Sequence, residues 1–334
     1  RFISAEESDK NTSSLFEFDE NQLSTPFYNI VWNESGHLTS VHDKEHHREV
    51  LKSEGRGNVL QIFEDKPMNW DAWDIDIFYN DKKKELSADS IEVREMDALN
   101  ASVVFHYTFG KSTIEQVMKV YADSRRIDFE TNVDWKEKQQ LLKAAFEVDI
   151  RANEATYDIQ FGNVKRTTHW NTSWDMARFE SVGHQWVDLS EYGYGVSLMN
   201  NSKYGHDIKE NTMRISLLKS AIYPDPHADE REQQFVYSLM PHAGDFVEGN
   251  VVTEAWSLNN PLVPKQGKIL DKQQFFDIDS QHPVMIDAIK KAEDSDGIIV
   301  RLHDYTGGKQ SITLKPTFKY NTWVETNLME KVID

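Results

Sequence analysis

Two tryptophans alternate with acidic residues in one short stretch, Asn69-Trp70-Asp71-Ala72-Trp73-Asp74-Ile75-Asp76. This combination suits a sugar, because an indole stacks on the C–H face of the ring and a carboxylate accepts hydrogen bonds from paired hydroxyls. The alternative is a strand edge whose tryptophans fill a sandwich core while its aspartates face water. Residue types alone slightly favour the core interpretation.

A second cluster, residues 167–188, carries His169, Asp175, His184 and Asp188. These residue types bind metals, but no His-x-His or His-Glu-x-x-His spacing occurs. Structural roles are therefore expected, and no metal site or cofactor is predicted within this chain.

A third cluster lies in the polar stretch 200–207 and contains Asn201, Lys203 and Tyr204. Its donors and acceptors could hold a ligand. A plain polar turn explains the same residues and is the favoured interpretation.

The elements that must position these clusters are predicted to be strands, because alternating, β-branched and aromatic segments follow one another closely without helical periodicity. Residues 101–109, 113–121 and 127–135 indicate an antiparallel meander with one buried face. Further strands are predicted at 142–150, 195–199, 213–218, 233–240 and 251–256, and in the tail at 284–292, 297–303 and 311–314.

The predicted fold is all-β, with a large antiparallel β-sandwich followed by a small terminal β segment. A break at Leu258–Pro264 separates a sandwich over residues 1–262 from a C-terminal β domain over 263–334. About 70 residues are marginal for a separate core, so this segment either packs on the main sandwich or is the start of a truncated domain.

Charge and composition exclude several classes of protein. The chain carries 56 acidic against 37 basic residues, a formal net charge of −19, which disfavours nucleic acid and anionic lipid as partners. It has no cysteine, no apolar run long enough to span a membrane and no secretory signal at Arg1. We therefore expect a cytoplasmic protein, and a piece of a longer polypeptide.

Several ordered motifs resemble the C-terminal half of glycoside hydrolase family 38 α-mannosidases, above all the cytosolic, vacuolar and bacterial branch. The resemblance runs from about Phe16 to the last residue. The matching stretches are Asn69–Ile75, Phe179–Glu191, Gly195–Gly205, Arg214–Ser220 with Pro224-Asp225-Pro226, Tyr237–His242, Ile289–Leu302 and Glu325–Leu328.

This resemblance implies a galactose-mutarotase-like sandwich that packs on an N-terminal catalytic domain, which this chain lacks. That domain would hold zinc and hydrolyse terminal α-mannosides with retention of configuration. The present chain would supply no catalytic residue. Trp73 and Asp74 would line the substrate pocket, with Trp70 and Asp71 as further wall residues.

Two other functions stay open at this point. The chain could be a free-standing carbohydrate-binding module. It could also be a mutarotase-like sugar epimerase, for which His184 and Asp188 would be the acid/base candidates. A homo-oligomer formed through an exposed apolar face is a further possibility.

Overall fold

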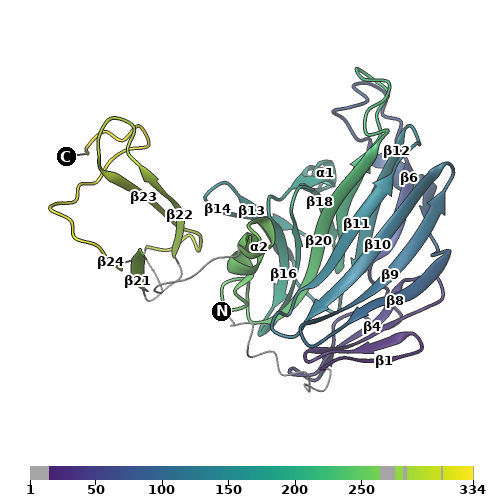
Figure 1. Ribbon diagram of the computed structural model, residues 1–334. Helices are drawn as coiled ribbons and strands as arrows, with labels where there is room; N and C mark the ends of the chain where they lie inside the picture. Colours follow the sequence, from purple (N-terminus) through teal and green to yellow (C-terminus); the bar gives the residue numbers. More distant parts are fainter. Residues whose placement is uncertain (1–14, 264–274, 281–283, 310, 334) are drawn as a thin grey trace. The chain divides into compact units, whose positions relative to one another are not determined.

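The computed structural model describes residues 15–263, 275–280, 284–309 and 311–333. The chain divides into two compact units, one formed by the residues up to 158 with 165–261, the other by 159–164 with 262–334. Both are built from antiparallel strands, so the all-β prediction is confirmed (Figure 1). The proposed domain types on either side of residue 262 stay a prediction.

Three sheets form between Glu17 and Ala243, and the largest has nine strands. Its strand order is β14 (Gly162–Thr167), β13 (Glu154–Ile159), β16 (Trp186–Glu191), β17 (Tyr194–Asn200), β20 (Glu232–Ala243), β11 (Ile127–Asp134), β10 (Ser112–Tyr121), β9 (Asn100–Phe109) and β8 (Ser90–Met96). The predicted meander is confirmed as β9, β10 and β11, in which Met118 faces Val103 and Phe129 across the ladder.

The six-stranded sheet faces the nine-stranded sheet and completes the sandwich. Its order is β15 (Ser181–Val182), β18 (Gly205–Lys209), β19 (Thr212–Lys219), β12 (Gln140–Glu147), β6 (Val59–Glu64) and β7 (Lys83–Glu85). Rings from the two sheets meet in the core, where Phe129 on β11 lies 5.8 Å from Phe146 on β12, centroid to centroid. Buried polar groups also cross this layer, since Tyr237 donates to Asn58 Oδ1 at 2.5 Å.

A five-stranded sheet formed early in the chain packs on the nine-stranded sheet. It runs in sequence order through β1 (Glu17–Asp19), β2 (Gln22–Ser24), β3 (Tyr28–Trp32), β4 (Leu38–Asp43) and β5 (Arg48–Glu49). Trp32 meets Phe105 of β9 edge to face, with centroids 6.1 Å apart. The buried carboxylate of Asp43 accepts a hydrogen bond from the Tyr194 hydroxyl at 2.8 Å and forms an ion pair with Arg125.

The predicted strand at 251–256 is wrong, because this segment lies in helix α2 (Val251–Asn259). Val251, Val252 and Ala255 are its buried residues, and spacings of one, three and four place them on one face of a helix. Strand propensity of the two valines suggested a strand, but tertiary packing decided the conformation. Among the described residues no helix is long and apolar enough to cross a membrane.

The remaining helical elements are short and lie beside the predicted clusters. The 3-10 helix η1 (Ile77–Lys82) follows the tryptophan stretch. Helix α1 (Ser173–Ala177) begins with a capping box, in which the Thr172 hydroxyl accepts the Asp175 N–H while the Asp175 carboxylate accepts the Thr172 N–H.

After residue 262, the described strands form two ribbons. They are β21 (Phe276–Ser280) with β24 (Ile312–Pro316), and β22 (Val284–Lys291) with β23 (Ile298–Asp304). The three tail strands predicted from sequence are thus present as β22, β23 and β24, and the turn at Asp294–Gly297 joins β22 to β23.

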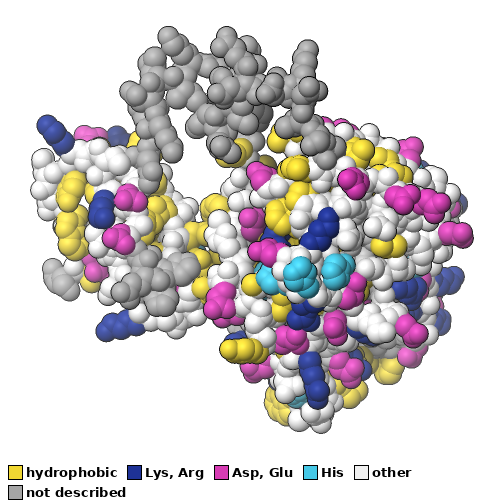
Figure 2. Space-filling view, turned by 90° about the horizontal axis from the view of Figure 1, so that it is seen from below, with side chains coloured by type: hydrophobic (Ala, Val, Ile, Leu, Met, Phe, Trp, Pro, Cys, Tyr) yellow, Lys and Arg dark blue, Asp and Glu magenta, His cyan; other side chains and the backbone are white. Residues whose placement is uncertain are grey.

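Acidic side chains are dispersed over the visible surface rather than concentrated in one patch. Figure 2 shows Asp and Glu scattered over one face with Lys and Arg between them.

Candidate functional site

The tryptophan stretch forms an exposed loop between β6 and η1, here called the aromatic loop (residues 65–76). Trp70 is 62% exposed and Trp73 is 64% exposed. Their rings meet edge to face with centroids 6.2 Å apart. Neither indole belongs to the sandwich core, so the core interpretation of this stretch is wrong.

Hydrogen bonds within the loop define its conformation. The N–H groups of Trp73 and Asp74 both donate to the Trp70 carbonyl, at 2.8 and 2.9 Å. Trp70 has a φ of 56°, a left-handed conformation uncommon for a bulky residue. The N–H of Met68 donates to Asp76 Oδ2 at 2.9 Å and ties the start of the loop to its end. The left-handed conformation of Trp70 persists only where surrounding contacts fix it.

Asp71 anchors the aromatic loop to the neighbouring loop that follows β19. Its Oδ2 accepts the N–H of Ile222 at 2.5 Å, and its Oδ1 lies 3.5 Å from Gln139 Nε2. The Asp71 carboxylate thus already has hydrogen-bond partners within the protein. Of the predicted wall residues, Trp70 and Trp73 present their rings to solvent, whereas Asp71 holds the loop in place.

A buried ion pair lies at the base of the aromatic loop. Asp65 is 2% exposed and pairs through Oδ2 with Lys219 of β19. Its Oδ1 is also buried and has no hydrogen-bond partner. Burial raises the pKa of Asp65, Lys219 opposes that rise, and the charges of Asp71 and Asp76 add to it. Sequence reasoning missed this pair, whose members lie 154 positions apart.

The exposed apolar surface extends from the aromatic loop to the loop after β19. Its members are Met68, Trp70, Trp73, Ile222 and Tyr223, which we call the aromatic face. Large exposed apolar groups clustered in this way mark an interaction surface more often than chance placement. The chain therefore presents an exposed apolar surface beside residues 70–76.

The third predicted cluster, at Asn201, Lys203 and Tyr204, has mostly internal partners. Asn201 exchanges hydrogen bonds with Val236 of β20, its Oδ1 accepting the Val236 N–H at 3.0 Å. The Lys203 ammonium lies 4.5 Å from the ring centre of Phe235, and burial lowers the pKa of this lysine. These contacts support the polar-turn interpretation.

The histidines and aspartates of residues 167–188 do not form one cluster. His169 Nδ1 lies 3.6 Å from Asp175 Oδ2. Asp188 is 2% exposed and accepts hydrogen bonds from His242 at 2.8 Å, Ser197 at 2.6 Å and Ser190 at 2.5 Å. A carboxylate buried and occupied in this way is not available as the acid or base of an epimerase. In the part of the chain that the structure describes, no group of three His, Asp or Glu side chains could hold a metal ion.

Comparison with known proteins gives matches along most of the chain. Residues 23–227 match the glycosyl hydrolases family 38 C-terminal domain, and residues 283–334 match the glycosyl hydrolases family 38 C-terminal beta sandwich domain. Alpha-mannosidase G of Dictyostelium discoideum is 37% identical over 326 residues, which cover 93% of this chain and 30% of that protein. Human alpha-mannosidase 2C1 is 33% identical over 307 residues, covering 89% of this chain and 29% of the relative.

A solved structure has the same fold. The crystal structure of an alpha-mannosidase from Enterococcus faecalis V583 superposes with a TM-score of 0.79 at 16% identity, covering 97% of this chain and 41% of that one. The chain thus spans about 30% of the length of its curated relatives.

Proposed function

We propose, from the premise that the chain belongs to glycosyl hydrolase family 38, that it is the non-catalytic C-terminal β region of an α-mannosidase. The complete enzyme would hydrolyse terminal α-mannosides with retention of configuration, through a covalent glycosyl intermediate. In this proposal the chain packs on an N-terminal catalytic domain of the same polypeptide and forms one wall of its substrate pocket.

The observation that carries the proposal is the exposure of Trp70 and Trp73 on an internally braced loop. Two large indoles in water, held by fixed backbone bonds, suit a surface that becomes covered by a sugar and a neighbouring domain. An inter-domain contact of roughly 600–1,500 Å² would cover the aromatic face. Asp74 would accept hydrogen bonds from sugar hydroxyls at the same wall.

The zinc implied by the family has no fitting residues in the described part of this chain, because no three metal-binding side chains gather there. We therefore expect the isolated chain to bind no stoichiometric zinc and to release no product from a chromogenic α-mannoside. Metal analysis after dialysis and a hydrolysis assay check both expectations. One tight zinc per chain, or turnover by the isolated chain, would place the catalytic machinery here instead.

A carbohydrate-binding module is the second candidate, favoured by the same exposed tryptophans. Titration of the isolated chain with mannose separates the two functions. A module should bind with a Kd of roughly millimolar or tighter, whereas one wall of a shared pocket should bind far more weakly. A mutarotation assay tests the epimerase alternative, against which the buried state of Asp188 argues.

The cellular setting belongs to the same proposal. A cytoplasmic location agrees with the absence of cysteine from the sequence. Self-association through the aromatic face would be a consequence of separating the chain from its catalytic domain. Fractionation of cells and sedimentation of the isolated chain test these two expectations.

A further inference from the structure

The aromatic loop is held in place along its length by residues outside it. Its start is fixed by the ion pair with Lys219, and its middle by the hydrogen bond from the Ile222 N–H. Trp73 lies beyond both attachments, so its placement depends on what holds the end of the loop. The end of the loop is held by Tyr79, the buried residue of η1.

Tyr79 contacts the end of the aromatic loop through both its backbone and its ring. Its N–H donates to the Asp76 carbonyl at 3.0 Å. Its ring meets that of Phe63 edge to face, with centroids 5.0 Å apart, in a small buried cluster against which Ile75 also packs. Because Ile75 and Asp76 closely follow Trp73 in the chain, the position of the Tyr79 ring constrains the backbone that carries the indole.

The Tyr79 hydroxyl is held in turn by a buried arginine of the six-stranded sheet. Arg214 of β19 donates from Nη2 to this hydroxyl at 3.2 Å and from Nη1 to Asn80 Oδ1 at 3.1 Å. Its Nε donates to Asp207 Oδ1 at 2.7 Å, and the fully buried Lys143 donates to Asp207 Oδ2 at 2.6 Å. A planar guanidinium with an acceptor at each nitrogen is fixed in orientation, so Arg214 also fixes η1.

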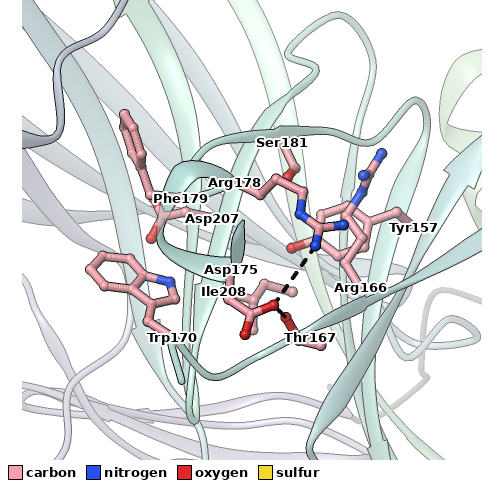
Figure 3. Close-up of a pocket in the computed structure, with 10 residues that line it drawn as sticks. All are labelled: Tyr157, Arg166, Thr167, Trp170, Asp175, Arg178, Phe179, Ser181, Asp207 and Ile208. Atoms are coloured by element: carbon pink, nitrogen blue, oxygen red, sulfur yellow. Dashed lines mark hydrogen bonds and ion pairs between the residues drawn. The ribbon is translucent and has the colours of Figure 1, made fainter. Parts of the chain in front are cut away.

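The protein also fills the space around this network. Phe179 lies 6.0 Å from Tyr79, centroid to centroid, and lines a small pocket together with Asp207 (Figure 3). This pocket has a volume of about 20 Å³, which is room for one water molecule. Tyr79 is 4% exposed, so it has little freedom to move and is too deeply buried to touch a substrate itself.

We propose that Tyr79, oriented by Arg214, is a positioning residue that sets the placement of Trp73 at the substrate wall. This inference rests on the proposed function, because only in that proposal does the Trp73 indole meet a mannoside. Its structural part, the dependence of Trp73 on Tyr79, is measurable in the isolated chain without substrate. Its functional part requires the full-length enzyme.

Fluorine NMR of the whole chain labelled with fluorotryptophan tests the structural part, and Trp73→Phe identifies the Trp73 signal. Tyr79→Leu keeps a buried apolar side chain but removes the ring and the hydroxyl, so the Trp73 signal should shift or broaden. Tyr28→Leu is the matched control, because Tyr28 of β3 is also a buried tyrosine beside an arginine, Arg125. The control should leave the Trp73 signal unchanged.

Tyr79→Phe is the second variant, in case Tyr79→Leu does not fold. It keeps the ring and removes only the acceptor of Arg214, so the Trp73 signal should change in the same way by a smaller amount. An unchanged Trp73 signal in Tyr79→Leu would overturn the proposal. Where Tyr79→Leu does not fold, an unchanged signal in Tyr79→Phe would do the same.

A double-mutant cycle in the full-length enzyme tests the functional part. Tyr79→Leu should lower kcat/KM for an α-mannoside by about fivefold or more, as expected for loss of the Trp73 contact. The double variant with Trp73→Ala should lose little more than Trp73→Ala alone, since no indole remains to be positioned. Two losses that multiply would overturn the positioning role. A changed Trp73 signal with wild-type kcat/KM would instead support the positioning of the loop and contradict the proposed substrate wall.

Discussion

Replacing Lys219 with methionine should destabilise the isolated chain by about 3 kcal/mol at neutral pH, as expected when a buried charge loses its partner. Asp65 would stay in its buried position with Oδ1 already unpartnered and Oδ2 now also without its ammonium. Denaturant unfolding measures the effect. Lys136→Met is the matched control, because the Lys136–Asp134 pair is exposed and should change stability by no more than about 0.5 kcal/mol.

The destabilisation should decrease as the pH falls. Burial raises the pKa of Asp65 in the folded chain, so this group stabilises the fold below its unfolded pKa of about 3.9 and loses that contribution as the pH rises through its folded pKa. Removing Lys219 raises the folded pKa further, and acid therefore neutralises the stranded carboxylate. The double variant with Asp65→Asn should recover much of the loss. A destabilisation equal at pH 7 and pH 5 would show that Asp65 is not its cause.

The strands were predictable because their side chains alternate between a buried and an exposed face. In β10, the residue pattern of 113–121 already indicates which side chains face the core, and the ladder pairs them as expected. Helix α2 was not predictable in this way, since its valines have strand propensity. Its helical state depends on packing by residues distant in sequence, such as Arg126, which donates to the Glu254 carbonyl at 3.1 Å.

The candidate site was predictable as a set of residue types but not as a geometry. The tryptophans of the aromatic loop suit a sugar wherever they lie, and only the structure shows that they are exposed. Asp71 and Asn201 looked like ligand-binding groups, yet each bonds a backbone N–H far along the chain, at Ile222 and Val236.

The second large effect is expected at Trp73 and concerns activity rather than stability. Trp73→Ala should change the free energy of unfolding of the isolated chain by no more than about 0.5 kcal/mol, because the indole is 64% exposed and outside the core. A buried tryptophan would instead cost about 3–5 kcal/mol. In the full-length enzyme, the same change should lower kcat/KM for an α-mannoside by about fivefold or more, since a lost stacking contact is worth about 1 kcal/mol.

Trp323→Ala provides the matched control for this experiment. Trp323 is exposed like Trp73 but lies in the second unit, outside the aromatic face. It should alter neither the stability of the chain nor the turnover of an α-mannoside. Any general effect of removing a surface indole would appear in both variants, whereas a role at the substrate pocket should appear only at Trp73.

The measurement that tests the central claim most directly is therefore kcat/KM of the full-length Trp73→Ala enzyme, read beside the unfolding free energy of the isolated Trp73→Ala chain. The account predicts a stable chain and an enzyme impaired by about fivefold or more, with the Trp323→Ala enzyme unchanged. Wild-type kcat/KM in the Trp73→Ala enzyme would contradict the assignment of the aromatic loop to the substrate pocket. So would a loss of activity that is fully explained by unfolding of the isolated chain.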